Sequence, residues 1–326
     1  MHAETSFARD PVRYATQITF SRTIRTPVRR SRKRMSPAAN TSVTAVTSVA
    51  DRPRGMPNRS LPLRDGLRIH THLGYPGNMS LGISFGLLLG LLVLPVLVSG
   101  CLLDGRGGVP WYEARRDPTG LAPDPASTPE AVIQVYAARA VSWRGAFSMH
   151  TWIAVKPTGA GRYTRYEVLG FGVANGAPAL RVDRMGPDNY WFGARPQILL
   201  DRRGPGVDAM IDKIRAAVAS YPYPHEYRAW PGPNSNTFTA YIAREIPELG
   251  LSLPSNAVGK DFLPGSALFA SAPSGSGFQV SLYGVAGILL AVDEGFELNI
   301  LGLNIGVDAA VPALKLPGIG RLGMQR

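Results

Sequence analysis

Hydrophobic and polar positions divide the chain into four parts of different character. The N-terminal part has little apolar periodicity, an uncharged apolar run follows it, a Gly- and Pro-rich stretch comes next, and only then do apolar positions recur with the spacing of strands and helices. These parts are an N-terminal extension (1–78), an apolar segment (79–103), a linker (104–129) and a folded domain (130–326).

The apolar segment predicts a membrane helix. From Leu81 to Val98 the sequence LGISFGLLLGLLVLPVLV contains no charged residue. At 1.5 Å per residue this run is about 27 Å long, close to the roughly 30 Å hydrocarbon core of a bilayer. It is either a retained anchor or a signal segment ending in VSGC, which resembles a bacterial lipobox with Cys101 as the lipidated residue. A buried helix of a soluble protein is the third interpretation.

Charge gives the orientation of that helix. Residues 1–78 carry 14 Lys and Arg against four Asp and Glu, so they hold +10 of the net charge of +12. By the positive-inside rule the Arg-rich side stays in the cytoplasm, and the C-terminal domain faces the periplasm of a bacterial cell. The extension itself is expected to be disordered, or untranslated if Met56 or Met79 is the true start. No aromatic residue interleaves its Arg run, so nucleic acid is not an expected partner.

The pattern after residue 130 predicts an α+β domain. Short β-branched runs predict strands at 132–137, 147–156, 163–172 and 196–200, with a hairpin across the turn PTGAGR. Apolar residues recur with helical spacing at 207–218 and 237–246, and the runs after residue 276 indicate further strands. We expect an antiparallel sheet packed with two or more helices.

Several kinds of site are excluded by composition. Cys101 is the only cysteine, so no intramolecular disulfide and no Cys-based zinc site can form. The domain also lacks a glycine-rich phosphate loop followed by Lys and a helix, and it lacks a pair of His with metal-ligand spacing. We therefore expect no cofactor and no metal.

One constellation carries candidate chemistry, and it joins His150 to Ser235. His150 lies in the predicted strand FSMHTWIAV, and Ser235 lies at the predicted start of a helix in GPNSNTFTAYIARE. A helix N-terminus presents free N–H groups and partial positive charge, which stabilise an alkoxide or oxyanion, while a strand holds an imidazole rigidly. That pairing suits nucleophilic catalysis. The plainer readings are a helix cap at Asn234 or Ser235 and a half-buried strand His.

The run Asn-Ser-Asn-Thr-Phe at 234–238 resembles the Asn-Cys-Asn-Thr-Phe signature of circularly permuted papain-like proteins, in which a His-bearing strand precedes the Cys helix. His150 with Thr151 and Trp152 is similar to the strand motif. The resemblance implies a permuted papain-like topology, Ser235 as nucleophile and His150 as base, although Ser replaces the Cys of that family. The segments YPYPHEYRAWPGPNSNTF and LKLPGIGRLG also resemble a family of uncharacterised bacterial membrane-anchored proteins.

Further candidates follow from position. If the hairpin turn centres near residues 159–160, position i pairs with 319 − i, and Glu167 becomes a diagonal neighbour of His150 that can orient its imidazole. A register shift of one residue would turn Glu167 to the opposite face. The expected ligand-binding residues around the pair are Trp152, Tyr227, Trp230, Asn234 and Asn236.

Two functions remain open at this point, and so does the question whether the protein is an enzyme. In the first, the cleft binds an envelope peptide or lipid, with or without cleavage by a weak Ser/His hydrolase or acyltransferase. In the second, an envelope structural or assembly protein uses the apolar C-terminal runs VAGILLAV and FELNILGLNIGV as an interface. Exposure of those runs would favour the second function.

Overall fold

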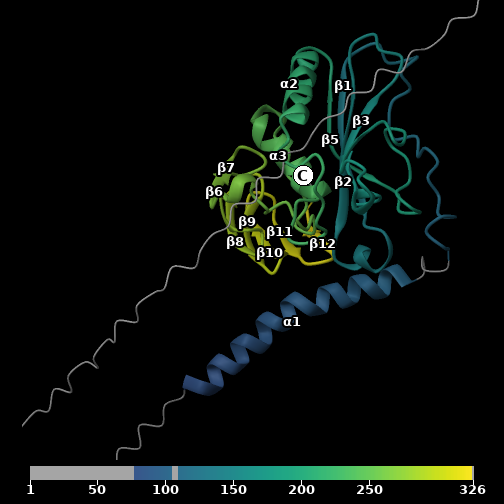
Figure 1. Ribbon diagram of the computed structural model, residues 1–326. Helices are drawn as coiled ribbons and strands as arrows, with labels where there is room; N and C mark the ends of the chain where they lie inside the picture. The colour runs from purple at the N-terminus through teal and green to yellow at the C-terminus, as the bar shows by residue number, and fades with distance from the viewer. Residues whose placement is uncertain (1–76, 105–108, 325–326) are drawn as a thin grey trace, which may run out of the picture. The chain divides into compact units, whose positions relative to one another are not determined.

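The computed structural model describes residues 77–104 and 109–324 (Figure 1). The expectations for the basic extension, apart from its last two residues, lie outside the described residues. Helix α1 (Gly77–Asp104) contains Pro95 and agrees with the predicted apolar segment. Between Gly82 and Leu102 it has the length and composition of a membrane anchor or a signal sequence. Cys101 lies in its last turn, free and exposed.

A five-stranded antiparallel sheet in the order β4-β3-β2-β1-β5 forms the first layer of the domain. Four of these strands were predicted from sequence, and the three-residue β4 was not. Their bounds are β1 (Val132–Arg139), β2 (Met149–Lys156), β3 (Thr164–Val168), β4 (Leu180–Val182) and β5 (Gln197–Arg203).

The register of the β2–β3 hairpin is the predicted one. Ile153 pairs with Tyr166 and Val155 pairs with Thr164, so the two residue numbers of each pair add up to 319. Since side chains alternate between the two faces of a strand, this register puts Glu167 on the same face as His150 and Arg165.

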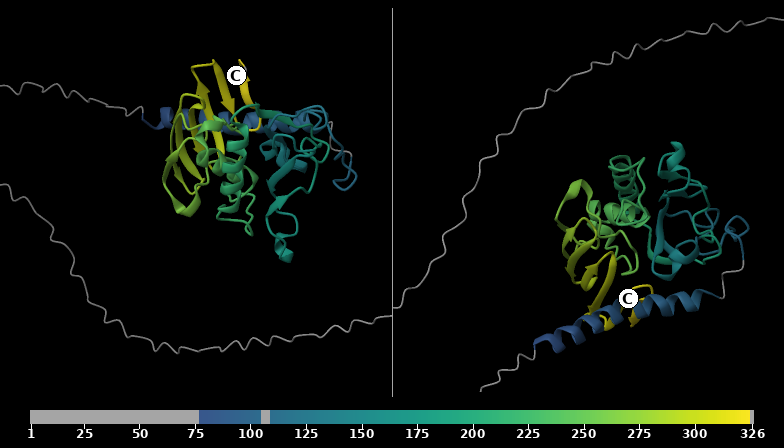
Figure 2. Two further views of the ribbon diagram at one scale, coloured as in Figure 1. Left: turned by 90° about the horizontal axis from the view of Figure 1, so that it is seen from above. Right: turned by 60° about the horizontal axis from the view of Figure 1, so that its bottom comes forward.

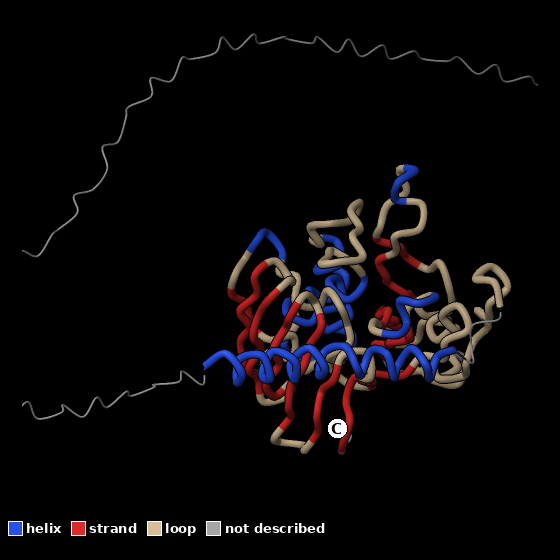
Figure 3. Tube along the Cα trace, turned by 90° about the horizontal axis from the view of Figure 1, so that it is seen from below, coloured by secondary structure: helices blue, strands red, loops and turns tan. Residues whose placement is uncertain are grey.

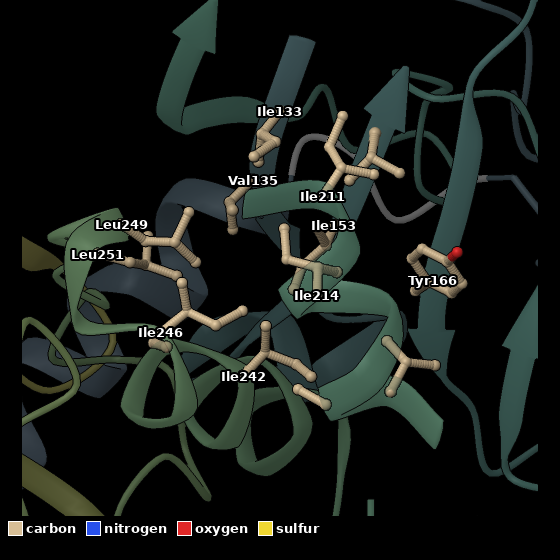
Figure 4. Close-up of a cluster of buried hydrophobic side chains, with 14 of the residues drawn as sticks. Ile133, Val135, Ile153, Tyr166, Ile211, Ile214, Ile242, Ile246, Leu249 and Leu251 are labelled. Atoms are coloured by element: carbon tan, nitrogen blue, oxygen red, sulfur yellow. The ribbon is translucent and has the colours of Figure 1, made fainter. Parts of the chain in front are cut away.

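Two helices, α2 (Val207–Ala219) and α3 (Ser235–Glu245), cover one face of this sheet. Their apolar stripes meet the inward residues of β1, β2 and β3 in the main hydrophobic core (Figure 4). The predicted second helix was expected from residue 237, but the observed one begins two residues earlier because Asn234 caps it. Labelled core residues include Ile133, Val135, Ile153, Ile211, Ile214, Ile242 and Ile246.

Irregular chain covers the opposite face of the first sheet. The described part of the expected linker contains no helix or strand, but it lies against the domain. Asp188 accepts hydrogen bonds from Thr119 Oγ1 and from the N–H groups of Leu121 and Ala122. Trp152 is fully buried under this cover and donates its indole N–H to Pro187 O over 2.7 Å.

The C-terminal part forms a second sheet of seven antiparallel strands in simple sequence order. Every strand pairs with its neighbour in the chain, so the sheet is a meander of hairpins (Figure 3). Helix α3 lies between the two sheets (Figure 2). The strands are β6 (Phe269–Ser271), β7 (Gly277–Leu282), β8 (Ala286–Ala291), β9 (Gly295–Ile300), β10 (Leu303–Asp308), β11 (Ala313–Leu316) and β12 (Gly320–Gly323).

Candidate functional site

A cavity of about 400 Å³ opens where the start of β2, the end of β3 and the N-terminus of α3 meet. The structure brings most of the sequence-predicted residues together in its wall, and Trp152 and Glu167 are not part of that wall. Glu167 lies behind His150, and Trp152 is buried beside it. The predicted residues in the wall are His150, Tyr227, Trp230, Asn234, Ser235 and Asn236.

The imidazole of His150 is held on its edge and on its face. Its Nε2 atom lies 3.1 Å from Oε2 of Glu167. Its ring stacks on the indole of Trp191, with the ring centroids 3.8 Å apart and the planes 16° from parallel. Because the pair and the stack fix both the direction and the plane of the ring, the second nitrogen, Nδ1, has a defined orientation.

Glu167 is in turn held by Arg165, whose Nη2 lies 2.6 Å from the same Oε2. Both side chains are almost completely buried. The guanidinium of Arg165 lies over the ring of Trp152, 4.1 Å from its centroid, and donates to Gly186 O. A buried carboxylate of this kind keeps its charge only because the cation and the hydrogen bonds compensate for lost hydration.

The two pKa shifts define the proton positions in this pair. Burial lowers the pKa of His150 below 6.5, although Glu167 opposes the shift. Burial alone would raise the pKa of Glu167, but the hydrogen bonds and charges of His150 and Arg165 lower it overall. Near neutral pH the pair therefore consists of a neutral imidazole and an ionised carboxylate. In that state Nε2 carries the proton and its N–H donates a hydrogen bond to Glu167 Oε2. Nδ1 is then a hydrogen-bond acceptor.

Asn234, not Ser235, is the cap of helix α3. The Asn234 Oδ1 atom accepts hydrogen bonds from the N–H groups of Asn236 and Thr237, over 2.9 and 3.1 Å. The Thr237 hydroxyl accepts the N–H of Asn234 in return, which completes a capping box. Ser235 is the first helical residue. Within the described ranges its hydroxyl makes no hydrogen bond, with His150 or with any other group.

Thr151 and Asn236 lock the helix start onto strand β2. The Thr151 hydroxyl donates toward Asn236 Oδ1 over 3.0 Å and reaches Ser235 O over 3.3 Å. The amide of Asn236 donates to Met149 O and to Val258 O. Since Thr151 follows His150 and Asn236 follows Ser235, these bonds fix the relative position of the two candidate catalytic residues.

The loop before α3 supplies an aromatic wall. The ring of Tyr227 lies directly on Gly170, where a Cβ atom would come within 2.6 Å of it. Trp230 donates its indole N–H to Leu301 O in the turn between β9 and β10. The absence of a side chain at residue 170 is thus what lets Tyr227 close this side of the cavity.

A larger cavity of about 750 Å³ continues from the first one, and Leu169, Phe171 and Trp191 belong to the walls of both. Arg116, Arg181 and Arg184 also line it, together with further aromatic residues. Arginine fits carboxylate and phosphate groups because its donors form a planar fork. This second cavity therefore suits the anionic part of a ligand.

Sequence reasoning missed Arg165 and Trp191. The position of Arg165, two residues before Glu167 in the same strand, was a usable signal, because residues i and i+2 share a face. Trp191 lies in an irregular loop and offered no pattern. Within the described part of the chain, no group of His, Cys, Asp and Glu is arranged to hold a metal ion.

Comparison with known proteins places the site within a family model. Residues 130–262 match the family described as protein of unknown function (DUF3750). The DUF3750 segment contains the first sheet, both of its helices and all three residues His150, Glu167 and Ser235. No curated protein and no solved structure matches the chain, so the comparisons give the papain-like resemblance no support.

Proposed function

We propose that the DUF3750 segment is an acyl-group hydrolase or transferase, with Ser235 as nucleophile, His150 as general base and Glu167 as the residue that orients the imidazole. The observation that carries the proposal is the role of Asn234. Because Asn234 satisfies the capping bonds of α3, the Ser235 hydroxyl has no part in the cap, and Ser235 lines the same cavity as His150.

The chemistry requires one proton acceptor and one anion site. The Ser235 Oγ attacks a carbonyl carbon of an ester or amide while its proton passes to Nδ1 of His150. The imidazolium formed is stabilised by Glu167, and it returns the proton to the leaving group. A water molecule then repeats the sequence on the acyl-serine and releases the acid.

The first turn of α3 supplies the anion site. The N–H groups of Asn236 and Thr237 are bonded to the Asn234 cap, but among the described residues the N–H of Ser235 donates to none. That N–H, with the partial positive charge of the helix end, can stabilise the oxyanion. The Ser235 hydroxyl and His150 are not hydrogen-bonded to each other in the described structure. In unliganded active sites the hydrogen bond between nucleophile and base is often long, and it shortens when substrate binds.

The shape of the two cavities favours an extended ligand with an apolar part and an anionic part. Aromatic side chains wall the first cavity, and three arginines line the second. A peptide with a free carboxylate or a lipid with a phosphate has this combination. With α1 as an anchor, we propose that the domain meets such a ligand at the periplasmic surface of a bacterial membrane.

Binding without cleavage is the second candidate function. The observation that favours it is the absence, in the described ranges, of a direct hydrogen bond between the Ser235 hydroxyl and His150. Serine is also a weaker nucleophile than the cysteine found in the protein class that this motif resembles.

A serine-directed fluorophosphonate probe tests the catalytic proposal without knowledge of the substrate. We expect the purified full chain to be labelled at Ser235 and Ser235→Ala to lose the label. Ser148→Ala is the matched control, because Ser148 lines the same cavity and should leave labelling unchanged. Absence of labelling in a folded wild-type chain would contradict catalysis and leave binding as the function of the cavity.

A further inference from the structure

In the second sheet the apolar side chains face outward and most polar side chains face inward. This is the reverse of the usual arrangement in a sheet with one face in water. Apart from Ser271 in β6, the outward side chains of the described strands are apolar and form three rows across the sheet. One row contains Phe278, Leu290, Phe296, Val307, Leu314 and Leu322, each paired with the next. The second contains Phe269, Val280, Ile288, Leu298 and Ile305, and the third contains Leu282, Ala286, Ile300 and Leu303.

These outward side chains are accessible to solvent. Phe278 is 53% exposed, Leu290 48% and Leu322 55%. The seven strands have three to six residues each. At about 3.4 Å per residue along a strand and about 4.8 Å between strands, they give a face of roughly 600 Å². Monomeric proteins in water rarely expose a contiguous apolar patch larger than a few hundred Å², so this face is expected to have an occupant.

Most side chains on the inward face of the same sheet are polar, and they are buried. Lys260 donates to Glu297 over 2.6 Å, and Lys315 donates to the other oxygen of that carboxylate over 2.5 Å. The Asp261 carboxylate accepts from Asn299 and Asn304. Because these groups have their partners only in this orientation, the sheet cannot be turned over to hide its apolar side.

We propose that this apolar face docks on a lipid bilayer, with its side chains among the upper parts of the acyl chains. The helix of membrane-span length, α1, contacts β10 and β11 at one end of the strands. Arg139 donates both to Ser99 Oγ in α1 and to Gly318 O in the turn between β11 and β12. A methyl group at Gly318 would come within 3.1 Å of the Ser99 side chain.

Two other turns at that end of the strands also carry exposed apolar or aromatic side chains. Tyr283 between β7 and β8 and Leu301 between β9 and β10 are both more than half exposed, and they lie at the same end of the strands as Gly318. A helix that spans the membrane and contacts this end of the strands brings the sheet to the bilayer surface.

The chemistry of the face favours lipid over protein. A protein interface of standard size makes about ten direct hydrogen bonds and has a polar rim. None of the side chains in the three rows can donate or accept a hydrogen bond. Acyl chains require no such partner, and they gain from contact with apolar side chains alone.

Depth-dependent fluorescence quenching tests the proposal in the full chain. In a Cys101→Ser background, Leu290→Cys carries a fluorophore, and the protein is reconstituted in phosphatidylcholine vesicles. We expect lipids brominated in the acyl chain to quench this label. Asp212→Cys, at an exposed position of α2, is the control and should be quenched only by aqueous iodide.

Two results would overturn the proposal. Quenching of the residue 290 label by iodide, with no effect of brominated lipid, would show that the face stays in water. Protection from both quenchers would show that a second copy or another protein covers it. Thermal melting of each labelled variant confirms that it is folded before its quenching is interpreted.

Discussion

The Nε2 atom of His150 lies 3.1 Å from Oε2 of Glu167, although the two residues are 17 positions apart in the chain. The hairpin between β2 and β3 brings them to the same face of the sheet, and Arg165 fixes the carboxylate from its other side. The pair is therefore part of the buried structure as well as part of the candidate site, and substitutions can separate the two roles.

Glu167→Gln is expected to destabilise the domain by about 3 kcal/mol, because it leaves the buried guanidinium of Arg165 without a counter-charge. Urea denaturation followed by circular dichroism measures this change. The double variant Arg165→Met with Glu167→Gln should lose less stability than the sum of the two single variants. Additive losses would contradict the coupling of the pair.

Acidification is expected to destabilise the folded domain through His150. Burial keeps the folded-state pKa of His150 below 6.5. Below that pH the unfolded chain therefore binds more protons at this residue than the folded chain does, which favours unfolding. The stabilisation is present above about pH 6.5 and is lost as the pH falls through the folded-state pKa. The lowered pKa of Glu167 extends the loss to more acidic pH in the same direction.

Urea midpoints at pH 7.5 and pH 5.5 measure this effect. We expect His150→Gln to reduce the difference between the two midpoints. His225→Gln is the control, since His225 lies exposed in the loop before α3. An unchanged difference in the His150 variant would assign the pH dependence to other groups.

Because Asn234 and not Ser235 caps α3, substitutions at these two neighbouring residues should differ in their effect on stability. Asn234→Ala removes the acceptor of two backbone N–H groups and should cost about 1–2 kcal/mol of unfolding free energy. Ser235→Ala should change it by less than about 0.5 kcal/mol, because the hydroxyl makes no hydrogen bond within the described ranges. Thermal or urea unfolding of both variants makes the comparison. Equal losses would mean that Ser235 also has a structural task.

A thiol at position 235 reports on the electrostatics of the cavity. In a Cys101→Ser background, Ser235→Cys should react with iodoacetamide at pH 7 about tenfold faster than Ser220→Cys, which lies at an exposed position after α2. The helix end and His150 both favour the thiolate. Adding His150→Ala should remove most of that advantage, and an equal rate with and without His150 would exclude their interaction.

The local patterns of the sequence were sufficient for most of the elements. Apolar and β-branched content identified the strands around His150 and Glu167, and the turn between them gave the observed register. Helix α2 was identified because its buried residues recur with a period of 3.6. The three-residue strands β4 and β6 are too short to give a period of their own, so they were not predicted.

Longer-range features of the site could not be obtained in this way. Trp191 stacks on His150 from an irregular loop, and nothing in the local sequence around it indicates that contact. The arrangement of Thr151 and Asn236 depends on hydrogen bonds between segments more than 80 residues apart. Such contacts are decided by tertiary packing, whereas periodicity reports only on neighbours in the chain.

Lys260 and Asp261 occupy nearly the last positions of the segment that matches the family model, yet they bind Glu297, Asn299 and Asn304 beyond it. The matched segment therefore ends in two buried charges whose compensation is encoded elsewhere in the chain. A homologue in which a different C-terminal region follows this segment would have to supply equivalent partners or change both residues. Covariation between positions 260–261 and the C-terminal strands would trace how the two halves of the domain evolved together.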